Sequence, residues 1–215
     1  MIGSIPSSIG NFCNLKYLDL SGNYLNGNLP EIIKGSETCS SKSPFLNLRE
    51  LHLSWNQLMG KLPNWLGELK NLRGLYLSDN KLEGPIPASL WALQHLEYLY
   101  LRLNKLNGTL PDSIGQLSQL QYLDASSNHL SGSLLEQHFW KLWKLEYLHM
   151  EFNSFHLNVS SNWVPLFQAV RATWVLHFQL GFNLKKTSGI LISQMTTFQV
   201  SFQIGFGIFL LAYIT

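Results

Sequence analysis

The sequence has few charged residues, few cysteines and little excess of either charge. Asp, Glu, Lys and Arg make up 13% of the 215 residues, and the formal net charge is +2. Nucleic-acid binding needs a strongly basic surface, so it is not expected. The two cysteines, Cys13 and Cys39, are too few for a disulfide scaffold and lack the spacing of zinc ligands. They could form one local bridge in an oxidising compartment, which the sequence leaves open.

The fingerprints of catalysis and of cofactor binding are absent as well. There is no G-x-S-x-G, P-loop or dinucleotide motif, and the seven histidines show no H-E-x-x-H or paired-ligand spacing. We therefore expect no catalytic residue, no metal and no cofactor. The N-terminus, "MIGSIPSSIGNF", has no basic segment followed by an apolar one, so it does not read as a signal peptide. This predicts either a cytosolic protein or a chain whose natural start is missing.

What the sequence does contain is a repeat. The pattern L-x-x-L-x-L-x-x-N-x-L recurs six times, from "LKYLDLSGNYL" to "LEYLHMEFNSF", and a half repeat, "GSIPSSIGNF", precedes it. Its asparagines are 24 or 25 residues apart after a first spacing of 33, which carries an insertion at about 34–45: Asn23, Asn56, Asn80, Asn104, Asn128 and Asn153. This period predicts an α/β repeat, a leucine-rich-repeat solenoid. Its concave face would carry a short parallel β-sheet, and its convex face 3₁₀ or short helical turns.

Each position of the pattern has a physical task. The leucines of L-x-L alternate into the core of a short strand, and the asparagine amide can bond backbone groups of the neighbouring coil, forming a structural ladder. Glycine fits positions that need a positive φ or a close backbone approach: Gly27, Gly60, Gly84, Gly108 and Gly132. Proline fits extended backbone without a donor: Pro30, Pro63, Pro87 and Pro111. No coil buries its apolar face alone, so stacking makes the core.

The 24-residue unit with its G-x-[IL]-P element resembles the plant-specific class of leucine-rich repeats. More narrowly, "GSETCSSKSPF", "LLEQHFWKL" and "LNVSSNWVPLFQ" are similar to segments of plant receptor-like proteins of the fungal-xylanase-receptor type. The resemblance covers residues 1 to about 168. It implies an extracellular solenoid between a signal peptide and one transmembrane helix, which senses extracellular molecules and signals through partner kinases. The chain would be an internal fragment of such an ectodomain.

Regular repeats stop at "NWVPLFQ", and no residue from Thr187 to Thr215 is charged. One interpretation is a membrane-inserting tail, since a span needs about 20 mostly apolar residues. Three glutamines, many hydroxyl side chains and the lack of basic residues behind the segment argue against it. We favour the alternative that the tail is translated out of frame, because shifted codons permit a further repeat with asparagine, glycine and proline in order. We therefore expect a solenoid over 1–168 and an aberrant tail over 169–215.

The positions that flank the core leucines line the concave sheet, which is the usual binding face of a solenoid. Aromatic rings give contact area at low entropy cost, and arginine gives bidentate hydrogen bonds. Tyrosine also suits a half-exposed strand by β-propensity alone. The residues expected to bind ligand are His52, Trp55, Tyr76, Tyr100, Arg102 and Asp124.

Two further sets of side chains have expected roles. Asn107 in "NGT" and Asn158 in "NVS" are glycosylation acceptors if the chain enters the secretory pathway. Phe139, Trp140 and Trp143 have i, i+3 and i, i+4 relations that favour a place in the core over a partner groove.

We therefore expect a non-enzymatic recognition module of a plant cell-surface receptor-like protein, on the extracellular side of the plasma membrane, in immune or developmental signalling. The resemblance implies an extracellular peptide, protein or glycan ligand and a co-receptor kinase, without nucleic acid. Membrane association would come only through a missing segment or the C-terminal tail. Two alternatives stay open: a secreted repeat protein that inhibits a microbial cell-wall enzyme, and a pseudogene product without function.

Overall fold

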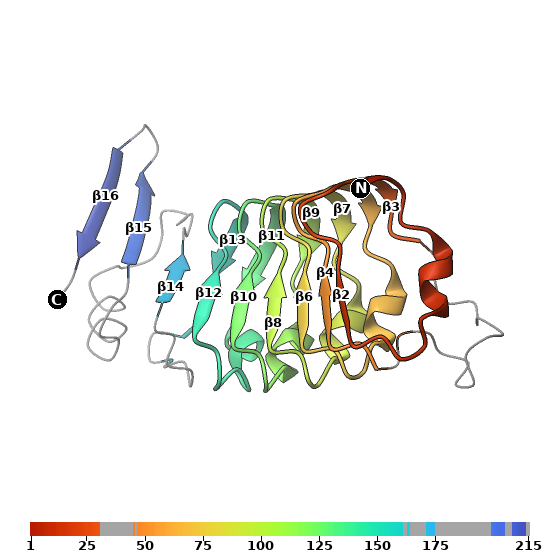
Figure 1. Cartoon of the computed structure of the whole chain (residues 1–215). Helices are drawn as coiled ribbons and strands as arrows, with labels where there is room; N and C mark the ends of the chain where they lie inside the picture. The colour runs from red at the N-terminus through yellow and green to blue at the C-terminus, as the bar shows by residue number, and fades with distance from the viewer. Residues whose placement is uncertain are drawn as a thin grey trace.

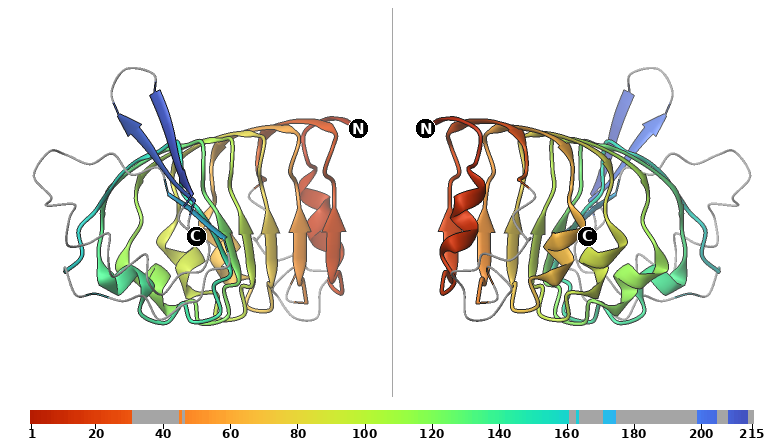
Figure 2. Two further views of the ribbon diagram at one scale, coloured as in Figure 1. Left: turned by 90° about the vertical axis from the view of Figure 1, so that its left-hand side faces the viewer. Right: turned by 90° about the vertical axis from the view of Figure 1, so that its right-hand side faces the viewer.

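The computed structural model describes residues 1–30, 45, 47–160, 163, 171–174, 199–204 and 208–213 of the chain. Its coils stack side by side, and each coil contributes one strand to a front sheet and a second strand to a sheet behind it (Figure 1). The views along the stack show these two layers joined by turns, with 3₁₀ helices on the side away from the front sheet (Figure 2). The solenoid predicted from the repeat is confirmed.

The concave sheet is parallel and in strict repeat register. Its strands hold the L-x-L segments, and each begins at the same repeat position: β2 (Tyr17–Asp19), β4 (Glu50–His52), β6 (Gly74–Tyr76), β8 (Tyr98–Tyr100), β10 (Tyr122–Asp124) and β12 (Tyr147–His149). Tyr98 pairs with Gly74 on one side and Tyr122 on the other. Side chains alternate across a strand, so the central leucine of each strand faces inward and its two neighbours face out.

A second parallel sheet was not anticipated from the sequence. Six of its strands are built from the residues that follow a repeat asparagine: β3 (Tyr24–Asn28), β5 (Gln57–Lys61), β7 (Lys81–Pro85), β9 (Lys105–Thr109), β11 (His129–Leu134) and β13 (Ser154–Leu157). A seventh, β1 (Ile2–Gly3), precedes the first repeat asparagine and pairs with β3. The five glycines expected at positive φ all lie in these strands, and their φ values range from +76 to +99. Because each glycine turns the chain without a side-chain clash, consecutive coils can pair here as well.

The convex turns are 3₁₀ helices, as expected: η1 (Ser7–Asn11), η2 (Asn64–Glu68), η3 (Ala88–Ala92), η4 (Asp112–Gln116) and η5 (Glu136–Phe139). Pro63, Pro87 and Pro111 precede η2, η3 and η4 in extended conformation. Neighbouring helices approach closely, since a Cβ atom on Gly115 would lie 2.1 Å from the Gln137 carbonyl oxygen. The leucines of every coil meet in one continuous buried core between the layers.

The expectation that Trp140 and Trp143 lie in the core is wrong. Both indoles are more than half exposed, whereas Phe139 is buried. The segment buries Phe139, Leu142 and Leu145, which recur every third residue. This is the period of a 3₁₀ helix rather than of an α-helix, and it turns the two tryptophans outward.

Strands also occur after residue 168. β14 (Arg171–Trp174) extends the concave sheet parallel to β12, with Arg171 opposite Tyr147. β15 (Gln199–Ile204) pairs parallel with β14, and β16 (Ile208–Tyr213) pairs antiparallel with β15. No helix in the described parts of the chain is long and apolar enough to span a bilayer. Most of 169–215 and of the insertion at 34–45 lies outside the described residues, so both boundaries stay predictions. Cys13 is disulfide-bonded, while Cys39 lies outside the described residues.

Candidate recognition surface

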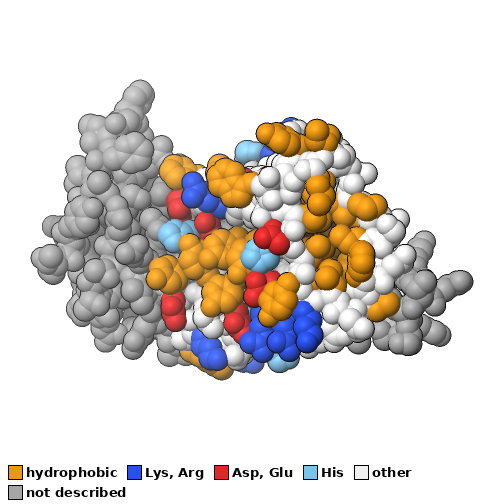
Figure 3. Space-filling model, in the orientation of Figure 1, with side chains coloured by type: hydrophobic (Ala, Val, Ile, Leu, Met, Phe, Trp, Pro, Cys, Tyr) orange, Lys and Arg blue, Asp and Glu red, His pale blue; other side chains and the backbone are white. Residues whose placement is uncertain are grey.

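Aromatic side chains stack along the outer face of the concave sheet. The His52 and Tyr76 ring centroids are 4.0 Å apart, those of Tyr76 and Tyr100 4.9 Å, and those of Tyr100 and Tyr122 4.4 Å, with nearly parallel planes. Strand spacing of about 4.8 Å brings rings on successive coils to stacking distance. We call this row the aromatic ladder: His52, Tyr76, Tyr100, Tyr122, Tyr147 and His149. In Figure 3 it contributes to the band of hydrophobic side chains across β8, β10 and β12.

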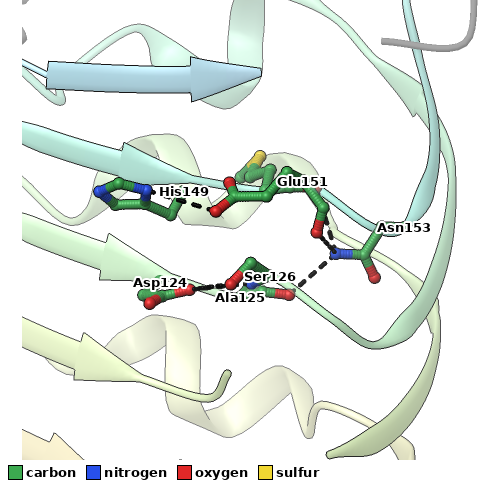
Figure 4. Close-up of polar contacts among 7 residues, drawn as sticks. Asp124, Ala125, Ser126, His149, Glu151 and Asn153 are labelled. Atoms are coloured by element: carbon green, nitrogen blue, oxygen red, sulfur yellow. Dashed lines mark hydrogen bonds and ion pairs between the residues drawn. The ribbon is translucent and has the colours of Figure 1, made fainter. Parts of the chain in front are cut away.

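The aromatic ladder changes column at Asp124. Tyr76 and Tyr100 occupy the third position of their strands, but Asp124 takes that position in β10, and Tyr122, at the first position, continues the stack. Asp124 is only 8% exposed, and its Oδ1 accepts hydrogen bonds from the Ser126 amide (3.0 Å) and hydroxyl (2.6 Å). Asp124, which was expected to bind ligand, is therefore mostly covered, and one of its carboxylate oxygens is engaged by Ser126 (Figure 4); its role in binding stays a prediction.

The residue before each repeat asparagine adopts a left-handed backbone conformation. Its φ lies between +53 and +62 in all six coils, at Gly22, Trp55, Asp79, Leu103, Ser127 and Phe152. This region suits glycine, asparagine or aspartate, and it costs other residues about 1–2 kcal/mol. Nevertheless three bulky apolar side chains occupy it, and they are 41% to 66% exposed. We call Trp55, Leu103 and Phe152 the apolar ridge; they lie on alternate coils along the edge of the concave sheet.

The ridge is held in place by the asparagine ladder beside it. Asn104 Oδ1 accepts the Leu82 N–H at 3.0 Å, and its Nδ2 donates to carbonyls of its own and the preceding coil, including Leu77 O at 3.0 Å. Asn56, Asn80, Asn128 and Asn153 make the same contacts in their coils. At the first coil, Asn23 Oδ1 accepts the amino terminus instead. These hydrogen bonds therefore fix the spacing between consecutive coils at this edge of the concave sheet.

Ionisable groups gather near the C-terminal end of the aromatic ladder. His149 Nδ1 lies 3.5 Å from Glu151 Oε1 (Figure 4), and this contact raises the pKa of His149 even though burial acts against it. The other carboxylate oxygen, Glu151 Oε2, is buried without a hydrogen-bond partner among the described residues. Arg102 lies exposed in the same region, and its charge acts on His149, Tyr122 and Asp79. Of these groups, Arg102 is the one whose charge is exposed on the surface.

Burial also changes the tyrosines. It raises the pKa of Tyr100 to about 12, with the neighbouring Tyr122, Tyr76 and Asp124 adding to the effect. The pKa values of Tyr76 and Tyr122 are raised for the same first reason. Removal from water disfavours the phenolate, so these three tyrosines remain neutral over the physiological pH range.

The structure brings the expected His52, Tyr76 and Tyr100 into one stack and places Trp55 and Arg102 beside it. Sequence reasoning did not select the others: Tyr122, Tyr147, His149, Glu151, Leu103 and Phe152. Their position within the repeat could have identified them. Each occupies the same repeat position as a selected residue, or as a residue next to a selected one, in another coil. Asn107 and Asn158 are both exposed, and their glycosylation stays a prediction. Among the described residues, no group of three His, Cys, Asp or Glu side chains could hold a metal.

Stacked coils with an asparagine ladder and a half-buried row of aromatic rings on the concave face define a repeat-built binding scaffold. Leucine-rich-repeat profiles match residues 14–36, 47–69, 71–93, 86–130 and 119–142, more than half of the sequence. The chain belongs to the leucine-rich-repeat family. No curated protein matches it in sequence.

The chain is similar to solved ectodomains of plant leucine-rich-repeat receptors. It is 27% identical (TM-score 0.68) to that of the Arabidopsis thaliana receptor kinase GASSHO1/SCHENGEN3, over 94% of this chain and 23% of that one. It is 26% identical (TM-score 0.63) to the plant peptide hormone receptor RGFR1, over 82% and 30%. With a chain of the Arabidopsis thaliana BIR3–SERK2 complex it shares 31% identity (TM-score 0.52) over 66% and 68%. The chain is therefore a non-enzymatic module and spans under a quarter of the GASSHO1 ectodomain.

Proposed function

We propose that this chain is a ligand-recognition part of a plant receptor-like ectodomain and binds a peptide or protein on its concave face. The observation that carries the proposal is the apolar ridge beside the aromatic ladder. Trp55, Leu103 and Phe152 are bulky, exposed and held in a backbone conformation that disfavours them. Folding alone favours smaller residues there, as at Gly22 and Ser127. Side chains retained against a local cost support a role in binding.

The mechanism is non-covalent capture across several coils. The tyrosines of the aromatic ladder give a flat, uncharged surface on which apolar groups lose water, and the apolar ridge borders it. Arg102 supplies bidentate donors for a carboxylate or a carbonyl of the ligand. Aromatic anchors and arginine are the residues that dominate binding energy at protein interfaces.

The neighbours support the class of ligand and the location. The GASSHO1/SCHENGEN3 ectodomain, from a plant membrane receptor kinase, is in complex with CASPARIAN STRIP INTEGRITY FACTOR 2, and RGFR1 is in complex with RGF2. We infer that this chain acts on the extracellular side of the plasma membrane, with a co-receptor kinase as signalling partner. Within that class we assign it to the fungal-xylanase-receptor type, in immune or developmental signalling, as an internal part of a longer ectodomain.

The test is selection of a random peptide library on the whole chain. Binders that use the concave face should bind the Trp55→Gly variant at least about tenfold more weakly, the loss expected for an interface anchor. The matched control is Trp140→Ser, which removes an exposed indole from the convex side. Equal losses in both variants, or none with Trp55→Gly, would reject the concave face as the binding surface.

We also propose that the solenoid ends near residue 168 and that 169–215 are translated out of frame. The antiparallel pairing of β15 with β16 supports this, because every other strand pairing of the described solenoid is parallel. The test is to sequence genomic DNA and transcript across the codons for Trp163 to Trp174. An insertion or deletion there supports the proposal, and an intact single frame rejects it.

A further inference from the structure

A row of basic residues borders the concave sheet at the edge opposite to the apolar ridge. The residue directly before each of the first three strands is Lys16, Arg49 or Arg73, and all three side chains are exposed. Backbone hydrogen bonds connect them from coil to coil: Arg49 N–H donates to Lys16 O, and Arg73 N–H to Arg49 O, both at 2.7 Å. Their backbones are therefore spaced like adjacent strands, about 4.8 Å apart. We call these three residues the basic row.

Among the described residues, few carboxylates offset the positive charge of the basic row. Lys16 and Arg49 form no ion pair within the described residues, and Arg73 contacts Glu97 at 3.2 Å through one nitrogen of a half-exposed side chain. Glu50, the carboxylate next to Arg49 in the chain, lies 2.9 Å from His52 Nε2. Figure 3 shows the result as one patch of Lys and Arg side chains below β2, β4 and β6, with acidic side chains below β8 and β12.

An equally regular row of amides runs beside it. Asn14, Asn47 and Asn71 stand two residues before the three cations, and all are exposed. The Asn47 Nδ2 group reaches Asn14 Oδ1 at 3.5 Å, so these side chains are aligned from coil to coil. Side-chain amides offer both donors and acceptors, and therefore suit hydroxyl groups.

The fold itself does not demand either row. In the next three coils the position of the cations is taken by Glu97, Gln121 and Glu146, and that of the amides by His95, Gln119 and Lys144. The same backbone geometry thus accepts either sign of charge, since Glu97 N–H bonds Arg73 O as Arg73 N–H bonds Arg49 O. Three cations and three amides on consecutive coils are therefore a local feature of the N-terminal half.

We propose that this edge binds a linear acidic glycan, a polymer whose sugar rings each carry a carboxylate and free hydroxyls. Its chain runs across the coils, with carboxylates on Lys16, Arg49 and Arg73 and hydroxyls on the asparagines. Each ring of such a polymer carries one carboxylate beside free hydroxyls, which matches a row of cations beside a row of amides. An extended acidic peptide supplies carboxylates without those hydroxyls, so it uses the basic row alone.

This glycan site is separate from the proposed concave-face function. It uses no member of the aromatic ladder or of the apolar ridge, so the two can succeed or fail independently. The test measures binding of a polygalacturonate oligomer to the whole chain by titration calorimetry. One variant, Lys16→Gln/Arg49→Gln/Arg73→Gln, removes the basic row. The matched control, Lys61→Gln/Lys81→Gln/Lys105→Gln, removes the same charge from exposed positions of the second sheet.

We expect the wild type to bind polygalacturonate with an affinity that decreases as salt is added. The affinity should fall about tenfold or more in the basic-row variant and stay nearly unchanged in the control. A neutral glucan should not bind. Equal losses in both variants would show attraction to net charge alone and overturn the site. Equal or tighter binding of poly-L-glutamate would overturn the glycan assignment, and no polygalacturonate binding by the wild type would overturn the proposal altogether. None of these outcomes bears on Trp55-dependent peptide binding.

Discussion

The imidazole of His52 lies 4.0 Å from the ring of Tyr76, centroid to centroid, with an angle of 16° between the planes. The two residues are separated by one full coil, and the pairing of β4 with β6 sets them opposite each other. This contact begins the aromatic ladder and shows how the repeat period is converted into a surface. A repeat position that holds a ring in successive coils produces a stack, without any contact that is local in the sequence.

The apolar ridge predicts an unusual order of stability. Trp55 has φ +59 and a mostly exposed side chain, so its removal loses little burial. Trp55→Gly should be more stable than Trp55→Ala by about 1 kcal/mol, because alanine keeps the left-handed strain and glycine does not. Urea unfolding of both variants measures the difference. Equal midpoints would show that the backbone at this position is not strained.

The asparagine ladder predicts a large effect from an isosteric change. Asn104→Asp removes the Nδ2 donor and directs a carboxylate at the carbonyls of Leu77, Leu101 and Arg102. We expect a loss of at least about 3 kcal/mol in the free energy of unfolding, since several buried acceptors lose their donor.

The control is Asn23→Asp in the first coil, where the oxygen accepts the amino terminus and the site is partly exposed. A carboxylate beside an ammonium group is favourable, so the loss there should stay below about 1 kcal/mol. Equal losses at the two positions would contradict the view that burial controls the value of each rung.

The contact between His149 and Glu151 predicts a stability that depends on pH. It raises the pKa of His149 above its ordinary 6.5, so the folded state binds this proton more tightly than the unfolded chain. The contribution is fully present below about pH 6.5 and disappears as the pH rises through the raised value. Urea midpoints measured on both sides of that window should decrease with pH, and His149→Gln should remove most of the decrease. His129→Gln, at an exposed position, serves as the control.

The tyrosines of the aromatic ladder predict alkaline destabilisation. Burial raises the pKa of Tyr100 to about 12, whereas the unfolded chain ionises at an ordinary 10.0. Stability should therefore decrease as the pH rises above about 10, because the unfolded state loses the proton first. Absorbance at alkaline pH should show a late phenolate phase, and Tyr100→Phe should reduce its amplitude, with the rest due to Tyr76 and Tyr122. A single early phase in the folded protein would show that the ring is well hydrated.

Most of the fold could be predicted from the sequence because its determinants lie within one coil. The 24-residue spacing indicates the strands, glycine marks the positive-φ positions within β3, β5, β7, β9 and β11, and proline marks the entry to η2, η3 and η4. Column alignment also places His52, Tyr76 and Tyr100 in one row. Each of these depends on residue type and period, which are local properties.

What the tertiary structure alone decided depends on the neighbouring coil, 24 or more residues away. The second sheet forms because consecutive coils come within hydrogen-bond distance on that side as well. Asp124 is covered because Ser126 folds onto it, and the stack moves to Tyr122 because no ring is available at that position. Trp140 and Trp143 point outward because the turn has a period of three residues. The sequence by itself determined the repeat and its register, while backbone approach between coils decided which of the repeated side chains form a surface.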